Sequence, residues 1–337
     1  MNKKRVLAML LAGAMALSMT ACGGGNSAST DGSSNDGGAS ASGGSYKVSV
    51  ILKTLAAEYW QYVKSGAEDY ASEHSDKVTV EVKGPSSETA FDEMQNMIET
   101  DLSSGTYDGI VISPLQSDTA AQLVSGTKLP IVAIDTNFTA PEVKSFVGTG
   151  NEAAAKKGGE AAVEAAKAAG WTDIKCIEIA GVQGDQTNTA RMNGYKAGVE
   201  EAGGTFLSDE VQYADATADR ATTAMEAIMQ THPEGIAIIC ANNDDMAMAA
   251  ARAGHDAYKN TIFLGFNGDR AACEAILDGQ MTMSVAQMAY EMGYKAVETM
   301  VQVLDGETVD EFVDSGSDVV TPDNAQERLD TLKTQLH

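Results

Sequence analysis

Short apolar runs alternate with alanine-rich amphipathic stretches along most of the chain, from about residue 46 onward. The apolar runs are rich in valine and isoleucine and are nearly continuous, which is typical of parallel strands covered on both faces. They predict strands at residues 47–52, 78–82, 109–112, 131–134, 174–179, 236–239, 262–265 and 281–285. The stretches between them predict helices at residues 59–73, 89–102, 151–169, 189–202, 218–229, 244–253 and 290–304.

This repeated strand–helix–strand pattern predicts an α/β fold with doubly wound parallel sheets. About 290 residues follow residue 45, which suits two such sheets with a cleft between them. In open α/β sheets, ligands bind beyond the carboxyl ends of the strands. The residues at and just after the strand ends are therefore the candidates for a binding site.

Polar and aromatic side chains gather at these strand ends. They are Lys53, Tyr59, Trp60, Asp135, Thr136, Asn137, Arg191, Asn243, Asn267 and Gln287. Charged and amide groups can bond pairs of hydroxyls, and aromatic faces can cover the C–H side of a sugar ring, so the set suits a polyhydroxylated ligand. The set contains no serine, histidine or cysteine that could act as a nucleophile or proton shuttle.

Several of these residues also have a purely structural interpretation. Tyr59 and Trp60 could face the core from the first helix. Asp135 could form a turn, and Asn243 could cap the helix that follows it. Arg191 could be an ordinary surface residue of its helix.

The first 21 residues have the pattern of a secretory signal. Three basic residues precede an apolar run at residues 6–17, and small residues lead to Cys22. Cleavage just before a cysteine is the pattern of bacterial lipoproteins, in which the thiol of that cysteine carries the lipid. The apolar run is too short for a transmembrane anchor. An ordinary secreted protein with a free Cys22 is the alternative.

Residues 22–45 predict a flexible tether behind the lipidated Cys22. They consist almost entirely of glycine, serine, alanine, asparagine, aspartate and threonine, which cannot bury enough apolar surface to fold. A coil of this length spans roughly 25 Å root-mean-square. We therefore expect an extracytoplasmic protein anchored to the cell membrane, with a Gram-positive surface favoured by the long tether.

Charge and cysteine content exclude some classes of partner. Without the signal the chain has 20 basic and 48 acidic residues, a formal net charge of −28. Such a chain repels nucleic acid and anionic lipid. Cys176, Cys240 and Cys273 are widely spaced, so they predict neither a disulfide framework nor a metal site. We expect a monomer without metal or cofactor.

A nucleotide-dependent enzyme is a further alternative, because residues 147–153 fit a loose GxGxxA dinucleotide fingerprint. The acidic residue expected about 20 positions later is absent. The structural interpretation is that Gly148 and Gly150 form a tight turn and Asn151 caps a helix. We therefore expect no enzyme.

A set of short motifs resembles the type I periplasmic-binding-protein family, in its monosaccharide branch of ribose- and allose-binding proteins. In order, they are "LKTL…YW", "ID" after the fourth strand, "ARxNG", "CANxDMA", "GFxG" and "GQMTxxVAQ". The resemblance covers about residues 46–320. It implies a solute receptor that feeds an ABC importer, with two lobes joined by a three-strand hinge that close on a sugar in Venus-flytrap fashion.

The same resemblance implies lobe boundaries and residue roles. The N-terminal lobe would take residues 46–149 plus 288–317, and the other lobe would take residues 150–287 plus 318–337. Hydroxyl groups would be bound by Lys53, Asp135, Arg191, Asn243 and Gln287, and Tyr59 and Trp60 would stack on the sugar ring.

Departures from the family pattern make the identity of the sugar uncertain. Asn267 stands in place of a carboxylate and Thr136 in place of an arginine, while Glu58 stands where proline is usual. Asn267 and Thr136, together with a missing third aromatic, argue against ribose or allose as the preferred ligand and favour a ligand of altered stereochemistry, a deoxy sugar, a ketose or a polyol. A receptor for a sugar-like autoinducer is the remaining alternative.

Overall fold

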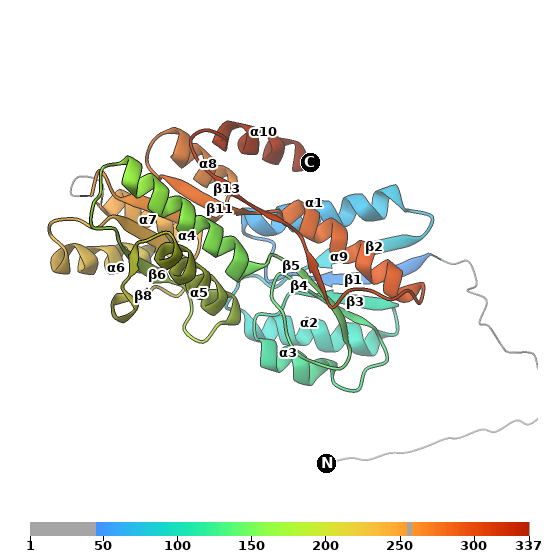
Figure 1. Ribbon diagram of the computed structural model, residues 1–337. Helices are drawn as coiled ribbons and strands as arrows, with labels where there is room; N and C mark the ends of the chain where they lie inside the picture. The colour runs from blue at the N-terminus through green and yellow to red at the C-terminus, as the bar shows by residue number, and fades with distance from the viewer. Residues whose placement is uncertain (1–44, 255–257, 337) are drawn as a thin grey trace, which may run out of the picture. The chain divides into compact units, whose positions relative to one another are not determined.

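A computed structural model describes residues 45–254 and 258–336 of the chain. Within these residues the chain forms two α/β lobes, each built on its own sheet (Figure 1). The predicted signal at residues 1–21, Cys22 and the tether up to residue 44 lie outside the described residues. No helix in the described part of the chain is both long and apolar enough to cross a membrane.

The first lobe contains a six-stranded sheet in the order β12-β5-β4-β3-β1-β2, and its strand pairs are all parallel. Its strands are β1 (Tyr46–Ile51), β2 (Val78–Lys83), β3 (Gly109–Ile112), β4 (Ile131–Ile134), β5 (Val143–Gly148) and β12 (Phe312–Asp314). Its helices are α1 (Glu58–Glu73), α2 (Phe91–Ser104), α3 (Ser117–Val124) and α9 (Ala289–Leu304).

Alternate side chains of these strands enter two different cores. Val48, Val111 and Val132 pack in the cluster that contains buried residues of α1 and α9. Ile110 and Ile131 pack in the cluster that contains residues of α2 and α3. Because successive side chains of a strand point to opposite faces, both faces of the sheet are covered.

The second lobe contains a seven-stranded sheet with β13-β11-β10-β9-β6-β7 in order and β8 paired to β6. Its strands are β6 (Lys175–Ala180), β7 (Thr205–Phe206), β8 (Gln212–Tyr213), β9 (Ile238–Ala241), β10 (Ile262–Asn267), β11 (Met283–Gln287) and the antiparallel β13 (Ser317–Val320). Its helices are α4 (Asn151–Ala168), α5 (Gln186–Glu201), α6 (Ala218–Thr231), α7 (Asp244–Gly254), α8 (Arg270–Leu277) and α10 (Ala325–Gln335), with a short 3₁₀ turn η1 (Ser208–Glu210). The predicted parallel-sheet lobes are thus confirmed.

The chain passes between the two sheets three times within residues 45–254 and 258–336. It crosses after β5, again after β11, and finally between β12 and β13. These crossings correspond to the three-strand hinge. The lobe boundaries at 149, 287 and 317 stay a prediction.

The first crossing changes the interpretation of the glycine-rich segment at residues 147–153. In a dinucleotide fold, the strand and helix of the fingerprint belong to one sheet. Here β5 belongs to the first sheet, whereas α4 packs on strands of the second. The N-cap of α4 is Gly150 and no side chain caps it, so the expectation that Asn151 caps this helix is wrong.

The strand predicted at residues 281–285 begins and ends two residues later, as β11. The amides of Gln280 and Met281 donate to the carbonyl of Ala275, at 2.8 and 3.1 Å, and thereby close the end of α8. Residue 281 is therefore held by the helix end, and the strand starts at Met283.

Candidate functional site

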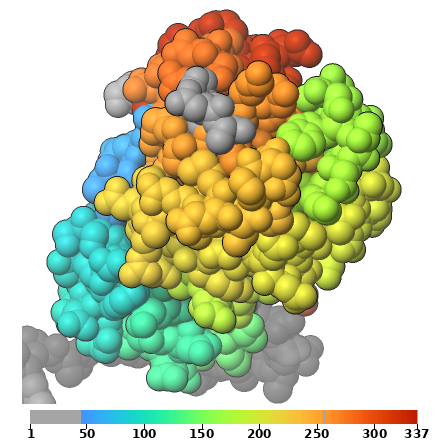
Figure 2. Space-filling view, turned by 90° about the vertical axis from the view of Figure 1, so that its left-hand side faces the viewer, coloured from blue at the N-terminus to red at the C-terminus, as the bar shows by residue number. Residues whose placement is uncertain are grey.

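A cavity of about 650 Å³ lies between the lobes and is lined by residues of both. Figure 2 shows one face on which the first lobe, blue to cyan, meets the second lobe, yellow to orange. The cavity brings together eight of the ten candidate residues. They are Lys53, Tyr59, Trp60, Asp135, Arg191, Asn243, Asn267 and Gln287.

These residues converge because several strands of both sheets end at the cavity. Lys53 follows β1 and Asp135 follows β4, while Asn267 and Gln287 are the last residues of β10 and β11. Parallel strands bring their carboxyl ends to one edge of a sheet, which is where ligands bind in open α/β folds.

Asp135 is the centre of the first lobe's polar wall. Its Oδ1 accepts a hydrogen bond from the Tyr59 hydroxyl at 2.9 Å, and its Oδ2 accepts one from the Thr136 hydroxyl at 2.8 Å. The Lys53 ammonium lies 3.7 Å from Oδ2. Asp135 also has a left-handed backbone, with φ of 62°. Strained backbone conformations of this kind are concentrated at functional sites.

Arg191 is buried on the facing wall, so the surface interpretation of this residue is wrong. Its Nε donates to Asn151 Oδ1 and its Nη1 donates to the Asn242 carbonyl, both at 2.8 Å. Its guanidinium carbon lies 3.9 Å from the centre of the Phe266 ring, a cation–π distance. Burial lowers the pKa of Arg191, while the nearby Asp135 raises it.

Tyr59 and Trp60 line the cavity and also belong to the packing around α1. Their rings meet edge to face with centres 5.0 Å apart. The Trp60 indole donates to Glu88 Oε1 at 2.8 Å. Burial and the neighbouring Asp135 raise the pKa of Tyr59, so its hydroxyl remains a donor at neutral pH.

Asn243 lines the cavity and caps α7 as well. Its Oδ1 accepts from the Met246 amide at 2.9 Å, and its Nδ2 donates to the Ala216 carbonyl at 3.1 Å. The capping interpretation is therefore confirmed for this residue. Since both ends of its amide are used, a ligand would compete for atoms that already have partners.

Asn267 and Gln287 form a pair of amides at the ends of neighbouring strands. The Gln287 Nε2 donates to Asn267 Oδ1 at 2.9 Å. The Asn267 side-chain amino group and the Gln287 side-chain oxygen, Oε1, make no hydrogen bond within the described residues. The pair thus offers a ligand a donor group, the Asn267 NH₂, and an acceptor, the Gln287 Oε1.

Thr136 and Asn137 are not among the residues that line the cavity. The Thr136 hydroxyl is buried against Asp135. Asn137 is exposed, and its Oδ1 accepts from the Phe138 amide at 2.9 Å.

The cavity also contains residues outside the ten candidates, among them Glu88, Asn188, Asn242 and Asp269. Asp269 caps α8, and burial raises its pKa to about 6. Asn242 precedes Asn243 in the same strand-end motif, so its position was a usable signal. Glu88 lies in a loop after β2, where no periodic pattern marks it.

The lining of the cavity is acidic. Its acidic members are Glu58, Glu88, Asp135, Asp185, Asp215, Asp245 and Asp269, against the basic Lys53 and Arg191. This excess of negative charge disfavours anionic ligands. No cluster of metal-ligating side chains occurs in the described part of the chain.

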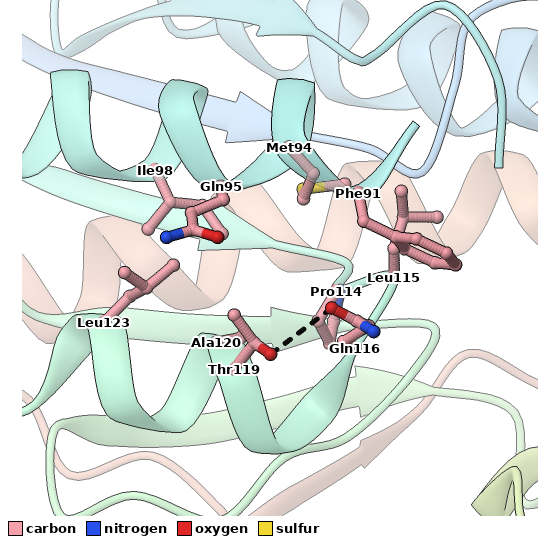
Figure 3. A pocket seen from close by; sticks show the side chains of 10 residues that line it. All are labelled: Phe91, Met94, Gln95, Ile98, Pro114, Leu115, Gln116, Thr119, Ala120 and Leu123. Atoms are coloured by element: carbon pink, nitrogen blue, oxygen red, sulfur yellow. Dashed lines mark hydrogen bonds between the residues drawn. The ribbon is translucent and has the colours of Figure 1, made fainter. Parts of the chain in front are cut away.

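A second, much smaller cavity of about 10 Å³ lies between α2 and α3. Figure 3 shows Phe91, Met94 and Leu123 around it, with Thr119 donating to Gln116 at 3.3 Å. Because this volume holds at most about one water molecule, the cavity does not accommodate a sugar.

Comparisons with known proteins agree with this architecture. The family model described as "Periplasmic binding protein domain" matches residues 48–308. The D-allose-binding periplasmic protein of Escherichia coli (strain K12) is 31% identical over 264 residues, covering 75% of this chain and 82% of that protein. The ribose import binding protein of the same organism is 27% identical over 266 residues, covering 78% of this chain and 86% of that protein.

Solved structures show the same fold. A carbohydrate transporter solute-binding protein from Agrobacterium radiobacter, in complex with D-arabinose, has a TM-score of 0.75 at 24% identity. The match covers 88% of this chain and 100% of that one. Together with the family match over more than half of the chain, these findings identify the chain as a member of the periplasmic binding protein domain family.

Proposed function

We propose that this protein captures an uncharged monosaccharide or related polyol between its two lobes and delivers it to an ABC importer. The observation that carries the proposal is the cavity of about 650 Å³, whose polar and aromatic walls come from both lobes. The relatives named for ribose import and allose binding support the same ligand class. The chain would bind its ligand without converting it.

The proposed site holds the ligand by hydrogen bonds to charged groups and by contact with aromatic rings. Asp135 and Arg191 would bond hydroxyls from opposite walls, with Lys53 beside Asp135. Tyr59 and Trp60 would cover an apolar face of the ring. Closure of the lobes would exclude water and strengthen these bonds.

A thermal-shift panel of pentoses, hexoses, polyols, a sugar-like autoinducer and D-galacturonate tests the ligand class. A ligand at 100 times its dissociation constant stabilises the folded protein by about 2.7 kcal/mol. We expect a neutral sugar or polyol to raise the melting temperature and D-galacturonate to leave it unchanged. If no neutral compound binds, and NAD-linked substrates are turned over instead, the proposal is wrong.

Substitutions at the two charged residues test the position of the site. Asp135→Ala and Arg191→Ala each remove a charged hydrogen-bonding group, worth roughly 1.5–3 kcal/mol, so affinity should fall about 10- to 150-fold by calorimetry. Asp118→Ala and Arg252→Ala, which change exposed residues, are the matched controls. Unchanged binding in both test variants would place the ligand elsewhere.

Asn267 would direct ligand preference away from ribose and allose. An aspartate there could only accept hydrogen bonds, whereas Asn267 offers its amino group as a donor. Asn267→Asp should therefore weaken binding of the best ligand from the panel and strengthen binding of ribose or allose. If the wild type already binds ribose or allose tightly and the substitution only strengthens that binding, the preference is misassigned.

We also propose that Cys22, outside the described residues, carries a lipid that anchors the protein to the membrane. The signal-like sequence before Cys22 supports this. Cys22→Ser should release the protein into the medium or periplasm, or leave an unprocessed precursor, as seen by fractionation and mass spectrometry. Unchanged processing and membrane retention would contradict the anchor.

A further inference from the structure

Arg328, in the C-terminal helix α10, reaches the strand ends that carry the amide pair of the cavity. Its Nη2 donates to the Gln287 carbonyl at 2.8 Å, and its Nε donates to the Gly268 carbonyl at 3.2 Å. Its Nη1 lies 3.2 Å from the sulfur of Met288. Arg328 is half-buried and does not line the cavity itself.

The two carbonyls that Arg328 binds belong to the ends of neighbouring strands. Gln287 ends β11, and Gly268 follows Asn267, the last residue of β10. The two strands are paired in parallel, with Asn267 opposite Ala286. One guanidinium therefore bridges the backbones on which the Asn267 and Gln287 side chains stand.

The backbone at this point requires restraint. Asn267 has φ of 136° and Gly268 has φ of 63°, both in the positive region that a non-glycine residue seldom adopts. The Gly268 amide donates to Asp244 Oδ2 at 2.7 Å, while its carbonyl accepts from Arg328. This residue is thus held on both sides, which stabilises the strained conformation of Asn267.

We propose that Arg328 is a positioning residue that keeps the Asn267–Gln287 amide pair in register and thereby sets the ligand preference of the cavity. The first part, that Arg328 positions the amide pair, is argued from the contacts of Arg328 alone. The second part rests on the proposed function of the cavity.

Arginine suits this role better than lysine does. Its planar fork presents several N–H donors in a fixed geometry, so it can bind two carbonyls at once. Lysine keeps the positive charge but concentrates its donors at one freely rotating ammonium. Arg328→Lys therefore separates the bridging geometry from the charge.

The first experiment needs no ligand. The side-chain NH₂ signals of Asn267 and Gln287 are recorded by ¹⁵N–¹H NMR and assigned with Asn267→Asp and Gln287→Glu. In Arg328→Lys, and in Arg328→Gln as a second variant, both signals should shift. The Gln287 signal should move toward that of a free amide, because its Nε2 donates to Asn267 Oδ1, and the Asn267 signal should move because its Oδ1 loses that donor. The signal of Asn243 should stay in place, because its partners are Ala216 and Met246.

The second experiment measures dissociation constants for D-ribose, D-allose, D-arabinose and myo-inositol. Loss of one hydrogen bond of about 1 kcal/mol corresponds to about fivefold in affinity, so Arg328→Lys should weaken the best of these ligands by roughly 5- to 20-fold. The ratios between the four ligands should also change. Lys333→Ala, on the same helix and paired with Asp330 at 3.2 Å, should change neither the signals nor the ratios.

The outcomes of the two experiments distinguish the two parts of the proposal, which are the positioning of the amide pair and the ligand preference. If both amide signals stay unchanged in folded variants, or if both variants unfold while Lys333→Ala does not, Arg328 is a folding residue and the proposal is wrong. If the signals move but affinities and ratios do not, Arg328 has no part in ligand preference. If none of the four compounds binds the wild type, the proposed function fails for this panel, and the NMR result still decides whether Arg328 positions the pair.

Discussion

At the scale of single residues, a buried acid lies behind the second lobe's wall of the cavity. Glu178 of β6 is fully buried, and neither carboxyl oxygen meets the geometry of a hydrogen bond within the described residues. Asn242 and Arg191 are close enough to favour its ionised form, and Glu178 in turn helps to raise the pKa of Cys240 and of Tyr195. Burial outweighs the favourable neighbours and raises the pKa of Glu178 to about 8.

Because the pKa of Glu178 is raised in the folded protein, the free energy of unfolding depends on pH. Between its unfolded pKa, about 4.3, and about 8, the native state binds the proton and the unfolded state does not, so stability falls as pH rises through this range. Glu178→Gln cannot ionise. The difference in unfolding free energy between Glu178→Gln and wild type should therefore shift in favour of the variant by roughly 2–4 kcal/mol from pH 5 to pH 8.5. Each pH unit in this range contributes about 1.4 kcal/mol.

Urea denaturation at the two pH values measures this difference. Glu152→Gln, at an exposed position of α4, is the matched control and should show little change in the same comparison. An equal pH dependence in wild type and Glu178→Gln would mean that Glu178 already ionises normally in the folded protein.

The polar and aromatic residues at the predicted strand ends include most of the candidate residues that line the cavity. Their hydrogen-bond partners could not be predicted in this way. Asp135 could be selected because it follows a recognisable strand. The sequence predicts Arg191 at the start of a helix, but α5 begins at Gln186 and Arg191 lies in its second turn. The bond from Arg191 to Asn151 joins residues 40 positions apart, and that from Tyr59 to Asp135 joins residues 76 apart. Such pairings depend on how the elements pack within each lobe, which local patterns do not encode.

At the scale of elements, α1 and α9 cross in close contact through two glycines. A methyl group at Gly66 would overlap the Tyr290 carbonyl oxygen, and one at Gly293 would overlap the Val63 carbonyl oxygen. The two backbones therefore approach more closely than any other residue would permit. This contact holds the two helices over the same face of the first sheet.

Gly66→Ala should force these helices apart. Overpacking of this kind costs about 1–3 kcal/mol, which should exceed the gain in helix propensity of about 1 kcal/mol. Urea denaturation should show lower stability for Gly66→Ala, whereas Lys64→Ala, two residues away on the same helix, should change it little. A stabilised Gly66→Ala variant would mean that the helices separate without cost.

Several elements that the sequence did not predict have weak patterns. β5 carries Lys144 and Ser145 among its apolar residues, and α3 is only eight residues long. The helix α10 reads as polar, since only Ala325, Leu329 and Leu332 are buried in it. These segments become regular because a neighbouring strand or helix covers them, a tertiary effect that propensity and periodicity do not contain.

At the scale of the whole molecule, an ion pair joins the two lobes. Glu58 begins α1 in the first lobe, and its Oε1 accepts from Arg270 Nε of α8 at 2.9 Å. Arg270 stands at the first turn of its helix, where the helix dipole disfavours a cation. The contact with Glu58 offsets this disadvantage and stabilises the arrangement in which the lobes meet.

Breaking this pair should weaken ligand binding slightly. Both side chains are partly exposed, so the pair contributes at most about 1 kcal/mol, or about fivefold in affinity. Arg270→Gln should show this loss by calorimetry, and 0.5 M salt should reduce the difference from wild type. The exchanged variant Glu58→Arg/Arg270→Glu should recover much of the affinity. No loss in Arg270→Gln would show that the pair does not bias closure.

The three crossings between the sheets determine when each lobe can be completed during synthesis. The first sheet lacks its edge strand β12 until residue 314 has been made, and the second lacks β13 until residue 320. The ribosome has therefore synthesised the chain beyond residue 310 before either lobe can complete its sheet. For a chain of a family that works outside the cytoplasm, this order keeps the polypeptide incomplete as a fold for most of its translation. This topology therefore postpones the completion of both sheets until residues 314 and 320 have been made.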